Sequence, residues 1–152
     1  MSMGPRARLV PELQVDSIQK SLAFWCDVLG FRIKYERPEV QFAYIELDGA
    51  ELMLDQRGSG PADRRGIWVT GPMERPYGRG INLEIQTAEF DATLARVKVA
   101  GIPIYFGPEE RWYRTGDVEL GVRQFLVQDP DGYLVRMQQG IGERPLSPTA
   151  PS

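Results

Sequence analysis

The residue types available for chemistry set the first limit on what this protein does. The 152 residues include no histidine and a single cysteine, Cys26. Without histidine there is no Ser-His or Cys-His pair, no imidazole metal ligand and no imidazole acid or base near neutral pH. Any chemistry must therefore use carboxylates, tyrosine, lysine, arginine, Cys26 or a borrowed cofactor.

Two carboxylates are candidates for acid/base chemistry. Glu51 or Glu84 could act as a base, with Arg123 or Tyr113 stabilising a developing negative charge. Cys26 has no basic neighbour in the sequence, so we expect an inert thiol. Nothing in the sequence identifies a substrate for such chemistry.

Aromatic residues offer a different kind of site, a surface for flat molecules. Phe42 and Tyr44 share one face of an expected strand, and Tyr35 lies on the strand before it. Ordinary sheet packing explains these three equally well. Trp112 and Tyr113 stand among charged neighbours where no apolar periodicity requires them, which favours contact with a ligand or a second protomer. The alternative is that their loop folds down and buries them.

Further candidates lie in the connector and in the second half of the chain. Trp68 is either a plug or the wall of a cleft. Glu84 shares a strand face with polar neighbours and is the candidate acid for a cationic ligand, with simple solvent exposure as the alternative. Arg123 and Arg136 would favour an anionic ligand instead if they faced inward.

The spacing of apolar residues predicts the elements that position the first group of candidates. Residues 9–15 alternate between apolar and polar side chains, as in a strand. Asp16 and Ser17 can cap a helix that runs to about Leu29 and ends at Gly30, and Trp25 lies on the apolar stripe of this helix, where we expect it to be buried in the protein core. Asp48-Gly49 is the dipeptide that a tight hairpin favours. Three further strands are expected at residues 31–35, 41–47 and 51–55.

The second half repeats this order after a connector rich in Gly, Pro and Arg. The pattern predicts a strand at residues 81–86, then a helix from Thr87 to about Ala100 that buries Phe90, Leu94, Val97 and Val99, ended by Gly101. A strand at 102–106, a long loop at 107–119 and strands at 122–128 and 133–138 follow. An Asp-Pro-Asp-Gly turn at 129–132 joins the last two strands.

These segments resemble the glyoxalase, bleomycin resistance and extradiol dioxygenase superfamily, the vicinal oxygen chelate fold. The resemblance covers about residues 8–139 and is carried by a helix that ends in Leu-Gly-Phe (29–31), the hairpin at 48–54, the helix end at 99–102 and the late Asp-Pro-Asp-Gly turn. It implies an α+β fold of two tandem βαβββ modules that form a curved-sheet cup. We expect one domain over residues 1–140, with module one at about 8–56, a connector at 57–79, module two at about 80–139 and a disordered tail at 141–152.

Metal enzymes of this superfamily take ligands from four strand positions. The resemblance places these at Val10, at Leu52 with Glu51 as the alternative, at Gly80 or Ile81, and at Arg136. At most one of these residues could coordinate a hard cation. We therefore expect no metal and no cofactor.

The resemblance is greatest to metal-free bleomycin resistance proteins, through residues 10–13, Phe24-Trp25 and residues 51–54. It implies a homodimer that sequesters a drug or metabolite in a cleft between protomers, which gives antibiotic resistance by binding alone. A small lyase or isomerase of the same superfamily is the alternative, and a scaffold that only dimerises is a third interpretation.

Charge and hydropathy limit the other partners. The chain has 18 basic and 21 acidic residues, a net charge of −3, and its arginines are scattered among acids. We therefore expect no nucleic-acid partner. No apolar stretch approaches membrane-helix length and no signal peptide is evident, so we expect no membrane partner and a cytoplasmic location.

Overall fold

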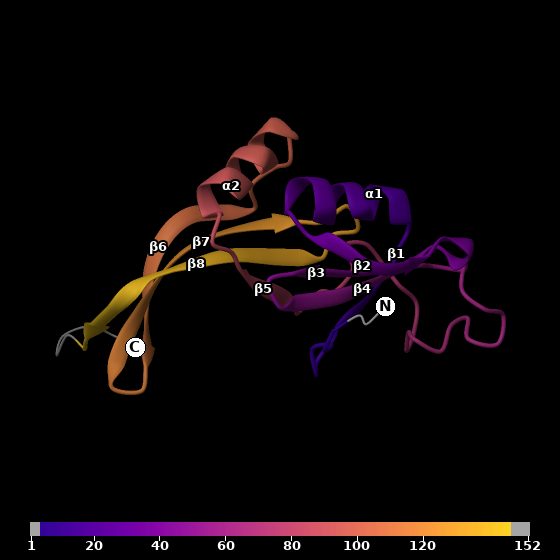
Figure 1. Cartoon of the computed structure of the whole chain (residues 1–152), viewed down its shortest axis with the longest axis horizontal. Coiled ribbons are helices and arrows are strands. Elements are labelled where there is room, and N and C mark those ends of the chain that lie inside the picture. Colours follow the sequence, from indigo (N-terminus) through magenta and orange to yellow (C-terminus); the bar gives the residue numbers. More distant parts are fainter. Residues whose placement is uncertain (1–3, 147–152) are drawn as a thin grey trace. The chain divides into compact units, whose positions relative to one another are not determined.

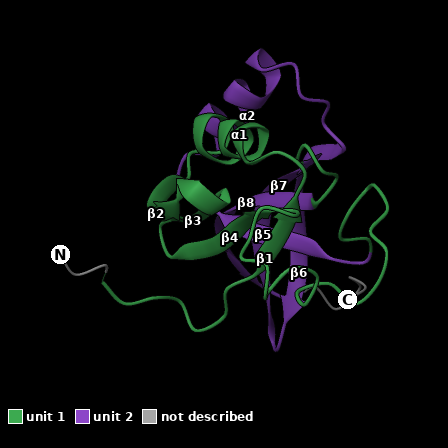
Figure 2. Ribbon diagram, turned by 90° about the vertical axis from the view of Figure 1, so that its right-hand side faces the viewer, with its two compact units in different colours: residues 1–79, 129–133 green, residues 80–128, 134–152 purple. Residues whose placement is uncertain are grey.

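The computed structural model describes residues 4–146 and divides the chain into two compact units. Unit 1 contains residues 1–79 together with 129–133, and unit 2 contains residues 80–128 and 134–152 (Figure 2). Each unit has one four-stranded sheet and the order strand, helix, three strands (Figure 1). The predicted α+β fold of tandem βαβββ modules is confirmed.

The unit 1 sheet has the strand order β1-β4-β3-β2. Its parallel pair is β1 with β4, and the helical segment connects β1 to β2 at the opposite edge of the sheet. The other two pairs, β2 with β3 and β3 with β4, are antiparallel and consecutive in the chain. Asp48 and Gly49 both have positive φ, 47° and 93°, as a two-residue type I′ turn between β3 and β4 requires. The strands are β1 Glu12–Val15, β2 Arg32–Arg37, β3 Phe42–Leu47 and β4 Ala50–Gln56, with a 3₁₀ turn η2 at Pro38–Val40.

The helical segment of unit 1 begins where the sequence predicts. The Ser17 hydroxyl accepts a hydrogen bond from the Lys20 amide at 3.3 Å, so it caps α1 (Ile18–Leu22). The helix then widens into a π-helix, η1 (Ala23–Val28), and Gly30 follows with φ 92°. Trp25 has no exposed surface and packs edge-on against Phe24 and Phe31, which confirms its place in the core.

The Asp-Pro-Asp-Gly turn belongs to unit 1 although it joins two strands of unit 2. Asp129 accepts hydrogen bonds from the Trp25 indole at 3.3 Å and from the Tyr133 amide at 2.9 Å. The Tyr133 hydroxyl donates to the Gln14 carbonyl at 2.9 Å. Arg75 binds Asp131 at 3.1 Å, so the turn is tied to β1, the helix and the connector together.

The unit 2 sheet has the strand order β5-β8-β7-β6, with β5 parallel to β8. Its strands are β5 Asn82–Gln86, β6 Phe106–Thr115, β7 Val118–Gln128 and β8 Leu134–Pro145. The predicted strand at 102–106 and loop at 107–119 are both wrong: residues 106–115 form one long edge strand, and the two-residue turn Gly116-Asp117 joins it to β7. The strand was missed because its exposed side chains carry charges on both faces, which hides the alternation of a half-buried strand.

Two further boundaries in unit 2 differ from the expectation. Helix α2 is Phe90–Val99 and starts three residues after Thr87, whose hydroxyl accepts from the Glu89 amide at 3.0 Å. Phe90, Leu94 and Val97 are buried as predicted, but Val99 is 89% exposed. Strand β8 continues to Pro145, so the predicted disordered tail is wrong for residues 141–145, and residues 147–152 of that tail lie outside the described residues.

No helix within residues 4–146 is both long enough and apolar enough to span a membrane.

Candidate functional site

Alternation along the unit 1 strands separates a helix-facing side from an open face. Leu13, Val15, Ile45 and Leu54 are buried with the helix on one side of the sheet. The alternate residues form the open face, and strand pairing sets Tyr44 beside both Tyr35 and Met53. This face contains Glu12 and Gln14 of β1, Tyr35 and Arg37 of β2, Phe42 and Tyr44 of β3, and Glu51, Met53 and Asp55 of β4.

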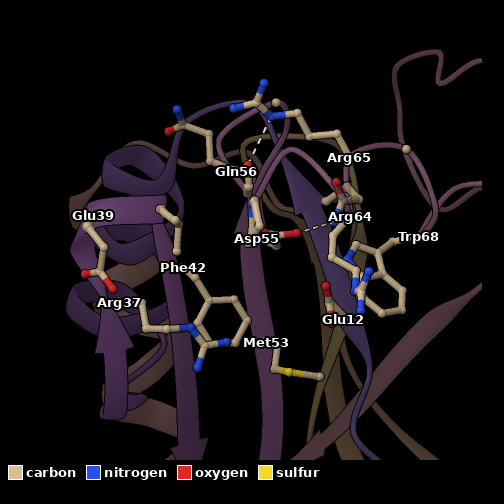
Figure 3. A pocket seen from close by; sticks show the side chains of 16 residues that line it. Glu12, Arg37, Glu39, Phe42, Met53, Asp55, Gln56, Arg64, Arg65 and Trp68 are labelled. Carbon is tan, nitrogen blue, oxygen red and sulfur yellow. Dashed lines mark hydrogen bonds between the residues drawn. The ribbon is translucent and has the colours of Figure 1, made fainter.

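A cavity of about 400 Å³ lies over one end of this open face, and unit 1 residues alone line it. Its floor is made of sheet residues, and the connector supplies the opposite wall (Figure 3). The volume falls in the range of small-molecule sites. The lining includes Glu12, Phe42, Met53 and Asp55 from the sheet, and Arg64 and Trp68 from the connector.

Two flat surfaces border the cavity. The Phe42 ring is covered by the Arg37 guanidinium, whose carbon lies 4.2 Å from the ring centre. Trp68 belongs to the connector wall, and 57% of its surface is exposed. A ligand that covers an exposed indole beside a cavity gains apolar and stacking contacts, which favour binding. Of the two alternatives for Trp68, the structure places it as a wall.

Two carboxyl groups meet at the floor of the cavity. Asp55 accepts a hydrogen bond from the Gln14 amide at 2.9 Å, and the Glu12 carboxyl on the neighbouring strand is hydrogen-bonded to Asp55. Partial burial, followed by the nearby negative charge of Asp55, raises the pKa of Glu12. Both carboxyl groups line the cavity, so one cationic group of a ligand could bind to the two of them together.

The other end of the open face is an aromatic box, which we define as Tyr35, Tyr44 and Glu51. The two tyrosine rings stack with centres 5.0 Å apart and planes 15° from parallel. The Tyr44 hydroxyl donates a short hydrogen bond to Glu51, and Lys34 lies 3.4 Å from the same carboxylate. These partners, the Tyr44 hydroxyl first, hold the pKa of Glu51 below its usual range. A carboxylate stabilised in this way is a weak base.

In unit 2 the predicted site residues lie in a polar network. Glu84 forms an ion pair with Arg136 at 3.0 Å, and Gln86 donates to Glu84 at 3.2 Å and also to Gln138. The negative charge of Glu84 is therefore balanced by Arg136 within unit 2. Arg123 binds Asp91 at 2.7 Å.

Trp112 and Tyr113 are on strand β6 rather than in a loop. Trp112 packs flat over Gly121 and lies beneath the Arg144 guanidinium, 4.2 Å from the ring centre. The Tyr113 hydroxyl accepts from Gln124 at 2.8 Å, and 40% of Tyr113 is exposed. The structure brings Phe42 and Trp68 to one cavity and Tyr35 with Tyr44 to the adjoining box, and it places Glu84, Trp112 and Tyr113 in the other unit.

The positions that the resemblance assigns to metal ligands contain few side chains that could coordinate a metal ion. Glu51 is on the open face and Leu52 faces the helix, so Glu51 is the relevant residue of the two. Arg136 is held by Glu84, and Val10 and Gly80 have no donor side chain. Among residues 4–146, no three carboxylates or thiols gather in a group that could hold a metal ion.

Glu12 and Asp55 are the functional candidates that sequence reasoning missed. The strand period places Glu12, Gln14 and Asp55 on one face, but which face is open follows only from the position of the helix. Gly58, Gly60 and Gly66 of the connector also line the cavity, and their spacing gives no signal of that role.

A family model described as the Glyoxalase/Bleomycin resistance protein/Dioxygenase superfamily matches residues 8–137. The chain belongs to this superfamily, as the sequence predicts. Particular closeness to bleomycin resistance proteins stays a prediction.

Solved structures of the superfamily and its fold are similar to this chain. A superfamily member from Vibrio splendidus 12B01 is 36% identical, over 88% of this chain and 98% of its own, with a TM-score of 0.39. A virulence protein from Salmonella typhimurium is 23% identical, over 90% of this chain and 99% of its own, with a TM-score of 0.61. TioX from Micromonospora sp. ML1 is 19% identical, over 91% of this chain and 100% of its own, with a TM-score of 0.66. The chain matches none of the curated proteins.

Proposed function

We propose that this protein binds a small molecule without a metal and without turnover, as bleomycin resistance proteins do. The ligand, a drug or a metabolite, would be flat and cationic and would lie in the unit 1 cavity. Sequestration by such a protein would confer resistance to a toxic ligand.

The observation that carries the proposal is the composition of the cavity. The exposed indole of Trp68 offers a flat apolar surface, and the Glu12–Asp55 pair adds negative charge between it and Phe42, whose ring is covered by Arg37. A planar cation satisfies both features, because it can stack on the Trp68 indole and donate hydrogen bonds to the carboxyl pair.

Three arginines, Arg37, Arg64 and Arg65, also line the cavity. Arg37 is stacked on Phe42, Arg64 binds Asp63 at 3.2 Å, and Arg65 donates to the Gly60 carbonyl at 3.0 Å. These contacts hold each guanidinium in place, although only Arg64 is paired with an acid. The proposed preference for a cation therefore rests on the position of the carboxyl pair rather than on the net charge of the lining.

A homodimer is part of the proposal. The resemblance supports it, and so do exposed apolar residues of unit 2, including Tyr105, Phe106 and Ile81, each more than half exposed. Sedimentation equilibrium at several protein concentrations tests this point, and a monomer at every concentration would exclude a dimeric binding cleft.

A fluorescence titration with a phleomycin-type antibiotic tests the binding function. We expect tryptophan emission to be quenched with saturation near one ligand per protomer. Trp68→Ala should weaken binding about tenfold or more, in line with the loss of a central aromatic contact. Trp112→Ala is the matched control, because Trp112 is the other partly exposed tryptophan and belongs to unit 2. Absence of quenching and of any thermal shift at high ligand concentration would contradict the proposal.

One observation favours a second candidate, a lyase or isomerase that uses carboxylate acid/base chemistry. Glu12 has a raised pKa beside a second carboxyl group, as acid/base residues commonly do. The other carboxylates considered, Glu51 and Glu84, are tied to cationic partners. Turnover of a metabolite that persists with chelator and is abolished by Glu12→Gln would establish this function in place of simple binding.

A further inference from the structure

The aromatic box already contains a cation that the chain itself supplies. The Arg6 guanidinium carbon lies 4.7 Å from the centre of the Tyr44 ring, and Arg6 is hydrogen-bonded to the Tyr44 oxygen. Tyr44 belongs to the open face of the sheet, yet none of its surface is exposed. Arg6 and the neighbouring Tyr35 ring together cover it.

The backbone on both sides of Arg6 is also held at the box. Lys34 donates to the Pro5 carbonyl at 3.0 Å, and the Ala7 amide is hydrogen-bonded to Glu51. We define residues 4–8 as the strap. Two backbone contacts and one guanidinium therefore attach the strap to the sheet, outside any strand or helix.

The strap differs from core packing in one respect. Arg6 itself is exposed to solvent, whereas the groups that it covers are buried. A side chain of this kind can leave without opening the helix-facing core, because its contacts are all on the open face. What it would uncover is an aromatic ring next to a carboxylate, the combination that recognises guanidinium and related cations.

The box adjoins the cavity of unit 1. Tyr35 lies 6.1 Å from Phe42 between ring centres, and Tyr44 pairs with Met53 across the strands; Phe42 and Met53 both line the cavity. A cationic group of a ligand in the cavity would therefore reach the box at the position that Arg6 of the strap now occupies.

We propose that the aromatic box is a guanidinium-binding subsite and that Arg6 occupies it as an internal competitor. The strap must leave before a guanidinium or amidinium group of a ligand can take the place of Arg6 over the Tyr44 ring, beside Glu51. This inference rests on the proposed binding function, because the subsite extends the same cavity.

Phenylguanidine is a suitable probe, and phenylurea is its neutral counterpart of the same shape. We expect Arg6→Ala to bind phenylguanidine about tenfold more tightly than the unaltered chain, as follows if the strap is closed about 90% of the time. Phenylurea binding should change little. Isothermal titration calorimetry on the full chain measures both affinities.

Three further variants identify the cause of the effect. Arg8→Ala removes the same side chain from an exposed position on the strap and should leave phenylguanidine affinity unchanged. Arg6→Lys keeps a cation and should retain most of the competition. Glu51→Gln combined with Arg6→Ala should remove the gain, with circular dichroism confirming that the double variant is folded.

Equal phenylguanidine affinity in the unaltered chain and in Arg6→Ala would overturn the proposal and leave Arg6 as a structural contact. So would equal gains for phenylguanidine and phenylurea, because charge recognition would then play no part. This failure is distinguishable from failure of the proposed function. If antibiotic binding depends on Trp68 but not on Arg6, only the proposal that Arg6 competes for the box is overturned. If no antibiotic binds but Arg6→Ala still strengthens phenylguanidine binding, the proposed antibiotic-binding function is overturned instead.

Discussion

The two units share one topology and differ in what their open faces present. In unit 1 the alternate residues of the sheet are aromatic and acidic, and the connector folds over them to enclose a cavity. In unit 2 the matching positions hold Glu84, Gln86, Arg136 and Gln138, which bind one another. A repeated βαβββ unit therefore fixes where a site can lie, and the side chains on alternate strand positions decide which copy becomes one.

The units also differ in where their additional residues go. Unit 1 has a long connector, residues 57–79, which supplies Trp68 and Arg64 to the cavity wall. Unit 2 has long hairpin strands, β6 and β7, which extend the sheet. Unit 1 also has more buried aromatic packing, and it contains the Asp-Pro-Asp-Gly turn at residues 129–132, which we call the clamped turn because β1, the helix and the connector all bind it. Variants in the two units test this asymmetry.

The largest expected difference concerns the tryptophans. Trp25→Ala should lower the free energy of unfolding by about 4 kcal/mol, because it empties a fully buried site and removes the indole that donates to Asp129. Trp112→Ala, in unit 2, should cost less than half as much, since Trp112 is only partly buried. Urea denaturation followed by circular dichroism measures both, and equal losses would contradict the asymmetry.

Two glycines with positive φ provide the next comparison. A Cβ at Gly132, in the clamped turn, would lie 2.3 Å from the Pro76 Cβ, whereas a Cβ at Gly116, in the unit 2 hairpin, meets nothing within 4 Å. Gly132→Ala should therefore cost about 3 kcal/mol, from strain and overlap together. Gly116→Ala should cost about 1 kcal/mol, from backbone strain alone. Similar melting temperatures for the two variants would show that the clamp adds no rigidity.

Asp129 of the clamped turn makes the stability of the protein depend on pH. Burial raises its pKa to about 6, despite hydrogen bonds from the Tyr133 and Asp131 amides and from Trp25. Because the folded state then holds this proton more tightly than the unfolded state, the contribution of Asp129 to stability falls as pH rises from about 4 to 6. The loss is about 3 kcal/mol at most.

Stability measured by urea denaturation from pH 4 to 7 separates this effect from that of other carboxylates. Asp129→Asn should remove the Asp129 contribution and so change the slope of unfolding free energy against pH, whatever its own effect on stability. Parallel profiles for Asp129→Asn and the unaltered chain would refute the assignment.

The smallest expected effect is in unit 2. A Cβ at Gly121 would lie 2.7 Å from the Trp112 ring, and one at Gly140 would meet nothing within 4 Å. Gly121→Ala should cost about 1 to 2 kcal/mol as the partly exposed ring shifts aside. Gly140→Ala should be close to neutral in thermal denaturation, and a larger loss there than at Gly121 would contradict the packing of Trp112.

Most of the fold could be predicted because its signals are local. The Ser17 cap, the Asp48-Gly49 turn and the buried helix positions other than Val99 each follow from residue type and spacing. The errors fall where long-range pairing overrides local pattern. Residues 106–115 contain Gly107 and Pro108 and carry charges on both faces, yet pairing with β7 makes them a strand.

The candidate site was predictable only in part. Phe42 and Trp68 could be proposed from residue type, but their common cavity depends on how the connector folds over the sheet. Glu12 was missed because a single carboxylate on a short strand has no distinctive spacing. Its partner Asp55 becomes a neighbour only through the parallel pairing of β1 with β4.

The most direct test of the account is a backbone amide NMR titration of the full chain with a phleomycin-type antibiotic. We expect the largest shift changes at the cavity, at Phe42, Met53, Gly58, Gly60 and Trp68, and smaller changes along β5 and β8 of unit 2. Changes confined to unit 2, or none at saturating ligand, would contradict the central claim that the open face of unit 1 is the binding site.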